Sequence, residues 1–270
     1  MRRIILILSS FTVMLASCEK NYQPFTDTPI IESYLSPGAH PVIKIYRQIP
    51  FESDVTYSSD NIDSLAVTLK YNDKTTLLKP VGDSCYSDTS LSIEENTKYT
   101  LSFEFNSRNV SAYTSVPAKP VDYTQSVTGI SLQKMDSTFT PGGSFEMPDP
   151  VKLTWKNDDT SYYIVVVENM ETTLDPVRDF GTTTAPPNMF RERPTTASGL
   201  ELRPMEFRYF GKHRIILFHV QPDYASLYDN NNTSSSQNLT NPSTSITNGY
   251  GIFTGLNSDT LYLEVTKASK

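Results

Sequence analysis

Strict alternation of apolar and polar side chains is the feature of this sequence that most restricts its fold. In residues 98–106, KYTLSFEFN, aromatic and aliphatic side chains occupy every second position from Tyr99 to Phe105. A period of two is that of a β-strand with one buried face. The same alternation occurs in residues 64–71 and 260–265, and no helical period continues for three turns. The chain is therefore expected to be all-β.

Further β-branched and aromatic runs, bounded by turn residues, extend the strand pattern along the chain. They are residues 42–47, 109–116, 152–155, 162–168 and 214–220.

Two prolines, Pro117 and Pro120, separate one series of strands from the next. The sequence thus predicts two tandem β-sandwich domains, at 26–118 and 121–268, a division that suits the chain length. One short helix is expected in PDYASLYDN, with Pro222 in its first turn.

The second half of the chain carries an immunoglobulin-like signature. VKLTWKNDDTSYYIVVVEN, residues 151–169, resembles the second and third strands of fibronectin type III domains, in which the tryptophan packs between the sheets. Trp155 is therefore expected in the core, with a sugar-stacking platform as the alternative. Gly249 and Gly251 alternate with larger side chains, which favours close backbone packing over a ligand cradle.

The N-terminus has the layout of an export signal. A positively charged start and an apolar run over 4–15 precede Leu-Ala-Ser-Cys, ending at Cys18. The run is too short to span a bilayer. Leu-Ala-Ser-Cys resembles the lipobox of bacterial lipoproteins, which implies a signal peptide at 1–17, an acylated Cys18 and a lipidated tether at 18–25. An ordinary secretory signal with a chance cysteine is the alternative.

The charge balance restricts the partners. The chain has 23 Lys and Arg against 30 Asp and Glu, a formal net charge of −7. Such a chain lacks the basic surface that nucleic acid requires, so no nucleic-acid partner is expected. Contact with the membrane is expected through acyl chains such as palmitate on the N-terminal cysteine. Cys85 would then have no disulfide partner in the mature chain, and its acidic or neutral neighbours predict an unreactive thiol.

No familiar catalytic or metal-binding motif occurs. His213 and His219 would share one face of a strand but lie about 20 Å apart at ~3.3 Å per residue, and His40 has no ligand spacing near it. Asp158 and Asp159 are adjacent in a turn and are expected to point apart. We therefore expect no cofactor, no metal and no enzymatic activity, with binding as the default role. A surface enzyme whose carboxylates converge only in the folded chain is the alternative.

Two long segments do not alternate. Residues 174–204 hold five prolines, and residues 229–248 form a polar Asn- and Ser-rich tract that we interpret as a mobile loop. The proline-bearing segment is the candidate contact surface, through Phe190, Arg191 and Arg193, because aromatic and arginine side chains carry much of the energy of interfaces.

Three short sites resemble the Asp-Ser/Thr-apolar sequences at which Bacteroidota glycosylate exported proteins on oxygen. They place candidate O-glycosylation at Ser64, Ser137 and Thr260.

Residues 90–117, SLSIEENTKYTLSFEFNSRNVSAYTSVP, together with HVQPDYASLYDN and NPSTSITNGYGIFTG, resemble a family of Bacteroidota lipoproteins called domain of unknown function 4249. The resemblance covers nearly the whole mature chain. It implies an outer-membrane lipoprotein, often encoded beside TonB-dependent transporters, with no assigned activity. We therefore expect a lipid-anchored protein on the cell surface that helps such a transporter to capture a peptide or glycan. A glycan- or peptide-hydrolysing surface enzyme and an adhesion or structural lipoprotein are the alternatives.

Overall fold

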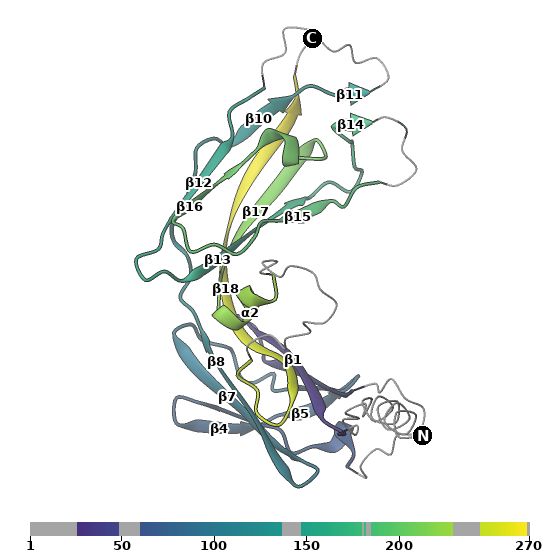
Figure 1. Ribbon diagram of the computed structural model, residues 1–270, viewed down its shortest axis with the longest axis vertical. Coiled ribbons are helices and arrows are strands. Elements are labelled where there is room, and N and C mark those ends of the chain that lie inside the picture. Colours follow the sequence, from purple (N-terminus) through teal and green to yellow (C-terminus); the bar gives the residue numbers. More distant parts are fainter. Residues whose placement is uncertain are drawn as a thin grey trace, which may run out of the picture.

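The computed structural model describes residues 26–48, 60–136, 147–179, 181, 185–228 and 244–268. The described chain is all-β with a short α-helix, as the alternation predicts, and it forms two lobes placed end to end (Figure 1). No helix among the described residues is long and apolar enough to cross a membrane.

The first lobe is built from two facing sheets. Its strands are β1 (Pro29–Leu35), β2 (Val42–Arg47), β3 (Thr68–Tyr71), β4 (Lys74–Leu77), β5 (Lys79–Gly82), β6 (Cys85–Ser87), β7 (Thr97–Phe105) and β8 (Arg108–Val116), with a 3-10 turn η1 (Ile62–Ser64). The order β4-β3-β7-β8 forms one sheet, and β1-β2-β6-β5 belongs to the other. The apolar side chains of β7 are buried between them, as its alternation predicts.

The second lobe is also a sandwich of two sheets. Its elements are β9 (Val121–Gln125), β10 (Gly129–Leu132), β11 (Met135–Asp136), β12 (Val151–Lys156), β13 (Tyr162–Asn169), β14 (Arg178–Asp179), β15 (Met189–Arg191), β16 (Gly199–Leu202), η2 (Pro204–Glu206), β17 (Gly211–Val220), α2 (Pro222–Ser226) and β18 (Tyr250–Lys267). One sheet has the order β16-β12-β9; the other contains β15-β13-β17-β18, with β10 also paired to β18.

Trp155 lies in the core of the second lobe, as the fibronectin-like pattern predicts. Its side chain is 3% exposed and its ring packs between Tyr123 and Tyr163, with centroid distances of 6.5 and 5.6 Å. A ring buried in this way has no face open to a sugar, so the role of Trp155 is packing.

The last strand, β18, joins the two lobes (Figure 1). Its residues 250–255 pair in parallel with β1, and residues 256–265 pair antiparallel with β17. Phe253 accordingly belongs to the first core and Leu263 to the second. The sequence predicts that all of 121–268 belongs to the second domain; the structure instead places the start of β18 in the first lobe.

The β1–β18 pairing depends on a glycine. Gly251 has a φ of +101°, and a Cβ built on it would lie 2.0 Å from the carbonyl oxygen of Ile31. Gly255 approaches the carbonyl oxygen of Ser115 in a similar way, with a Cβ distance of 2.5 Å. The sequence predicts close backbone packing around Gly251, and the structure confirms it.

Helix α2 lies at the junction of the lobes and is shorter than the nine residues of PDYASLYDN. Its Ala225 packs with Ile164 of β13 and Val220 of β17, on the face of the sheet opposite Trp155. Strand β13 therefore has apolar neighbours on both faces, which explains its nearly continuous apolar sequence.

Candidate functional site

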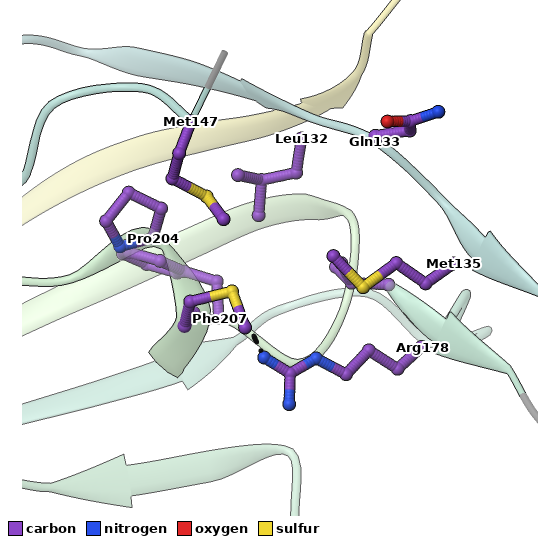
Figure 2. A pocket seen from close by; sticks show the side chains of 9 residues that line it. Leu132, Gln133, Met135, Met147, Arg178, Pro204 and Phe207 are labelled. Atoms are coloured by element: carbon purple, nitrogen blue, oxygen red, sulfur yellow. Dashed lines mark hydrogen bonds between the residues drawn. The ribbon is translucent and has the colours of Figure 1, made fainter. Parts of the chain in front are cut away.

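An open groove of about 390 Å³ lies on the second lobe, beside strand β15 and the turn η2. Its lining residues combine apolar side chains with charged ones; they are Arg178, Pro186, Phe190, Met205, Glu206, Phe207 and Arg208. We call this hollow the β15 groove. Figure 2 shows the small apolar pocket next to it, where Leu132, Met135 and Met147 gather near Phe207 and Arg178.

The turn η2 sets the side chains on one wall of the groove. Pro204 begins the turn, and the Glu206 carboxylate accepts from the backbone N–H of Arg203 at 2.7 Å and from its Nε at 3.2 Å. This cap fixes Met205 outward with 48% of its surface exposed, whereas Phe207 just after the turn is buried.

The opposite wall comes from β15. Phe190 pairs with Val167 of β13, and its ring meets the Phe207 ring edge to face at 6.0 Å. Phe207 packs in turn on the ring of His213, at 5.3 Å. The Tyr209 hydroxyl donates to the carbonyl of Pro186, which holds the segment before β15 against the lobe. The apolar wall is therefore anchored to the core.

The charges around the groove are arginines and two carboxyl groups. Arg178 and Arg208 are exposed and form no ion pair with any carboxylate in the described ranges; Nη2 of Arg178 lies 3.2 Å from Sδ of Met205. Glu206 is engaged by Arg203. Burial raises the pKa of the Glu192 carboxyl, and the nearby Glu206 carboxylate raises it further. The groove thus offers two guanidinium groups to an incoming anion.

The three residues predicted as a contact surface do not share one face. Phe190 faces the groove, as its packing on Phe207 shows, but Arg191 is its neighbour in β15 and points to the other face of the sheet. The Arg191 guanidinium lies 3.6 Å from the ring centroid of Tyr228. Arg193 is exposed beyond the end of β15. Of the three, Phe190 lines the groove, whereas Arg191 and Arg193 do not; a role in binding for each of them stays a prediction.

Arg191 instead joins a tyrosine cluster at the junction of the lobes, which consists of Tyr34, Tyr224 and Tyr228. Tyr224 meets Tyr34 edge to face at 5.8 Å and Tyr228 at 5.2 Å. Burial raises the pKa values of both Tyr34 and Tyr224. The rings pack against one another across β1 and α2, so this cluster holds the lobes together.

The histidines have structural contacts. His213 is buried, and Nδ1 lies 3.0 Å from the carbonyl oxygen of Gly211; burial lowers the pKa of its imidazole. His219 stacks on Tyr163 at 4.7 Å, and Nδ1 of His40 lies 2.9 Å from the carbonyl oxygen of Leu91. Within the ranges that the structure describes, no three His, Cys, Asp or Glu side chains come together as a metal site.

The adjacent carboxylates of the β12–β13 turn have different partners. Asp158 pairs with Lys156 at 3.0 Å, and Asp159 accepts from the backbone N–H of Ser161 at 3.2 Å. They act as turn residues that point apart, as the sequence predicted. Cys85 lines a second hollow of about 300 Å³ in the first lobe, where its thiol lies 3.5 Å from the carbonyl oxygen of Asp83.

The modification sites differ in their surroundings. Ser64 is exposed in η1, whereas Thr260 lies in the middle of β18, opposite Ile216 of β17, and is partly buried. Cys18 and Ser137 lie outside the described residues, as does most of the tract 229–248.

The residues that the sequence analysis missed are Arg178, Met205 and Phe207. A methionine or arginine between prolines carries no period, so no pattern marks these side chains as neighbours of Phe190. Pro204 is the one local signal, since proline favours the start of a helical turn.

The fold and the groove define an all-β protein of two sandwich lobes with a hollow on the second lobe. Residues 19–261 match the family model described as Domain of unknown function (DUF4249). The chain belongs to this family. No curated protein matches the chain.

Proposed function

We propose that this protein is a non-enzymatic lipoprotein of the outer membrane, anchored through Cys18 and exposed at the cell surface. It holds a peptide ligand, or a peptide segment of a partner, in the β15 groove. In this way it serves as an accessory to a TonB-dependent transporter in nutrient capture. The observation that carries the proposal is the open groove, in which apolar side chains lie beside Arg178 and Arg208, two arginines that form no ion pair with any carboxylate in the described ranges.

Exposed methionines support a binding role for this surface. Met205 is 48% exposed and Met147, in the adjoining pocket, is 41% exposed. Methionine is flexible and polarisable, so a surface rich in it adapts to varied apolar partners. An exposed apolar hollow in a folded domain is typical of an interaction site.

The position of the groove suits capture away from a membrane anchor. Figure 1 shows β1, the first described strand, in one lobe and β14, which carries Arg178, near the far end of the other. With lipid on Cys18, the groove would project outward beyond the first lobe. Resemblance to lipoproteins encoded beside TonB-dependent transporters supports the choice of partner.

Side-chain chemistry favours a peptide over a glycan. A sugar ring stacks on the open face of an aromatic side chain, but Phe207 is buried and meets Phe190 edge to face. Methionine, phenylalanine and arginine together match apolar side chains and carboxylates.

The test is affinity purification of the full-length lipidated protein from detergent-solubilised outer membranes. Met205→Glu places a carboxylate in the groove beside Arg178 and should remove the co-purified partner. Met170→Glu is the matched control, because Met170 is 46% exposed and lines no part of the groove. Partner recovery that is equal for both variants would contradict the proposal.

Two further measurements test the other parts of the proposal. Protease shaving of intact cells should cleave the protein if it is surface-exposed. If the purified protein hydrolyses a polysaccharide or a peptide, and substitution of one carboxylate abolishes this activity, the protein is an enzyme and the proposal of a non-enzymatic role is wrong.

A further inference from the structure

Strand β15 ends the long sheet on its side. Within the described residues it pairs only with β13, while its other side carries no strand. An unpaired edge presents backbone N–H and C=O groups to whatever lies beside it.

The register shows which groups face outward. Asn169 N–H donates to the Asn188 carbonyl, and Glu192 N–H donates to the Val165 carbonyl. In an antiparallel pair, hydrogen-bonded positions alternate along the strand. Phe190, midway between Asn188 and Glu192, therefore also bonds to β13. The backbone groups of Met189 and Arg191 point away from it, toward the open edge.

The groove lies on the face of β15 to which Phe190 points. Paired residues on neighbouring strands project to the same face. A residue of an added strand that stands opposite Phe190 would therefore extend its side chain into the groove, toward Met205 and Phe207. The backbone of that strand would meet Met189 and Arg191.

We propose that the ligand of the β15 groove is an extended peptide that joins the open edge of β15 as a further strand, with an apolar side chain in the groove and a carboxylate on Arg178 or Arg208. This inference rests on the proposed function. Strand addition supplies affinity through backbone hydrogen bonds and specificity through the side-chain pocket. The two arginines, which pair with no described carboxylate, complement an acidic peptide.

The first test measures binding of synthetic peptides to the full-length wild-type protein in detergent. The probe is acetyl-Thr-Leu-Thr-Leu-Thr-Glu-Glu with a free carboxyl terminus, and its partner ends in Lys-Lys-amide. The acidic probe should bind at least about tenfold more tightly than the basic one, since one charge-assisted hydrogen bond to a guanidinium contributes about a factor of ten or more in affinity. Failure of the acidic probe to bind at millimolar concentration overturns the proposal.

Two N-methylated forms of the acidic probe provide the sharper test. One is methylated on its odd-numbered backbone nitrogens and the other on its even-numbered ones. Only alternate N–H groups of an added strand face β15, so one form should lose about tenfold in affinity while the other binds within about twofold of the parent. Equal loss, or no loss, in the two forms contradicts strand addition.

A protein variant tests the same edge. Met189→Pro removes an outward N–H without removing a bond to β13, and proline is tolerated at such edge positions. The variant should bind the acidic probe about tenfold more weakly than the wild type does. A changed oligomeric state of Met189→Pro in size-exclusion chromatography would instead show that the edge pairs with a second copy, which overturns the proposal. Should this variant misfold, the methylated pair decides the question.

These experiments distinguish failure of strand addition from failure of the proposed function. If Met205→Glu loses the co-purified partner but both methylated probes bind equally, the groove binds in another way and only strand addition is wrong. If Met205→Glu keeps its partner, the proposed function itself is wrong.

Discussion

Gly251→Ala should destabilise the protein more than the same exchange at a positive-φ glycine that has open space around it. Gly251 lies where β18 crosses into the first lobe, and its φ of +101° is one that L-residues avoid. The backbone conformation alone costs ~1–2 kcal/mol for alanine. The new Cβ would also lie 2.0 Å from the carbonyl oxygen of Ile31, so β1 or β18 must shift.

Forcing the paired strands to shift at Ile31, whose side chain is fully buried, costs ~1–3 kcal/mol, which brings the expected loss of unfolding free energy to about 2–5 kcal/mol. Gly82→Ala is the matched control: its φ is +95°, nearly the same, but nothing lies within 4 Å of a Cβ there. Gly82→Ala should therefore lower the unfolding free energy only by the cost of the backbone conformation. The effect of alanine on the unfolded chain is common to both variants and cancels in the comparison.

The assay is urea unfolding of both variants and the wild type, followed by circular dichroism, with melting temperature as a second measure. The difference between the variants should be about 1–3 kcal/mol, or roughly 2–12 °C for a chain of this size. Equal destabilisation by the two exchanges would show that the contact with Ile31 contributes nothing and that the β1–β18 pairing tolerates a side chain.

Three further predictions concern modification and pH. Metabolic labelling with a fatty acid should mark the protein, and Cys18→Ala should abolish the label; unlabelled wild-type protein would refute the anchor. Burial holds the pKa of His213 below its ordinary value of 6.5, so the unfolded chain takes up a proton that the folded chain does not, and stability should fall as pH drops below about 6.5. His213→Phe should remove this slope, whatever constant cost it adds, and an unchanged slope would assign the dependence to other groups. Mass spectrometry of the native protein should find a glycan on the exposed Ser64 and none on Thr260, which is paired within β18; bare Ser64 peptides would refute the site.

Sequence alone could identify the long strands and the buried tryptophan. Strand β7 alternates because one of its faces is buried, and β13 is apolar along most of its length because both of its faces are covered. Each of these patterns is contained within its own strand. Trp155 between two strand patterns indicated the second sandwich for the same reason. Each inference needed only a window of a few residues.

Strand β15 shows where such reasoning fails. It is three residues long, too short for a period of two to be recognised, and it lies in a proline-rich segment whose sequence predicts a loop. Without a recognisable strand, the sequence predicts only that Phe190 and Arg191 belong to one contact segment, whereas neighbouring residues of a strand point to opposite faces.

The sequence by itself determined the class of the protein, since alternation, turn residues and the prolines at 117 and 120 depend on each segment's own chemistry. Only the tertiary structure decided that β18 crosses both lobes, because the choice of partner strand depends on residues more than 200 positions away in β1. The groove likewise exists only once η2 is placed beside β15. Side chains that form a site between separate elements have no common period, so their meeting is decided by packing and not by local pattern.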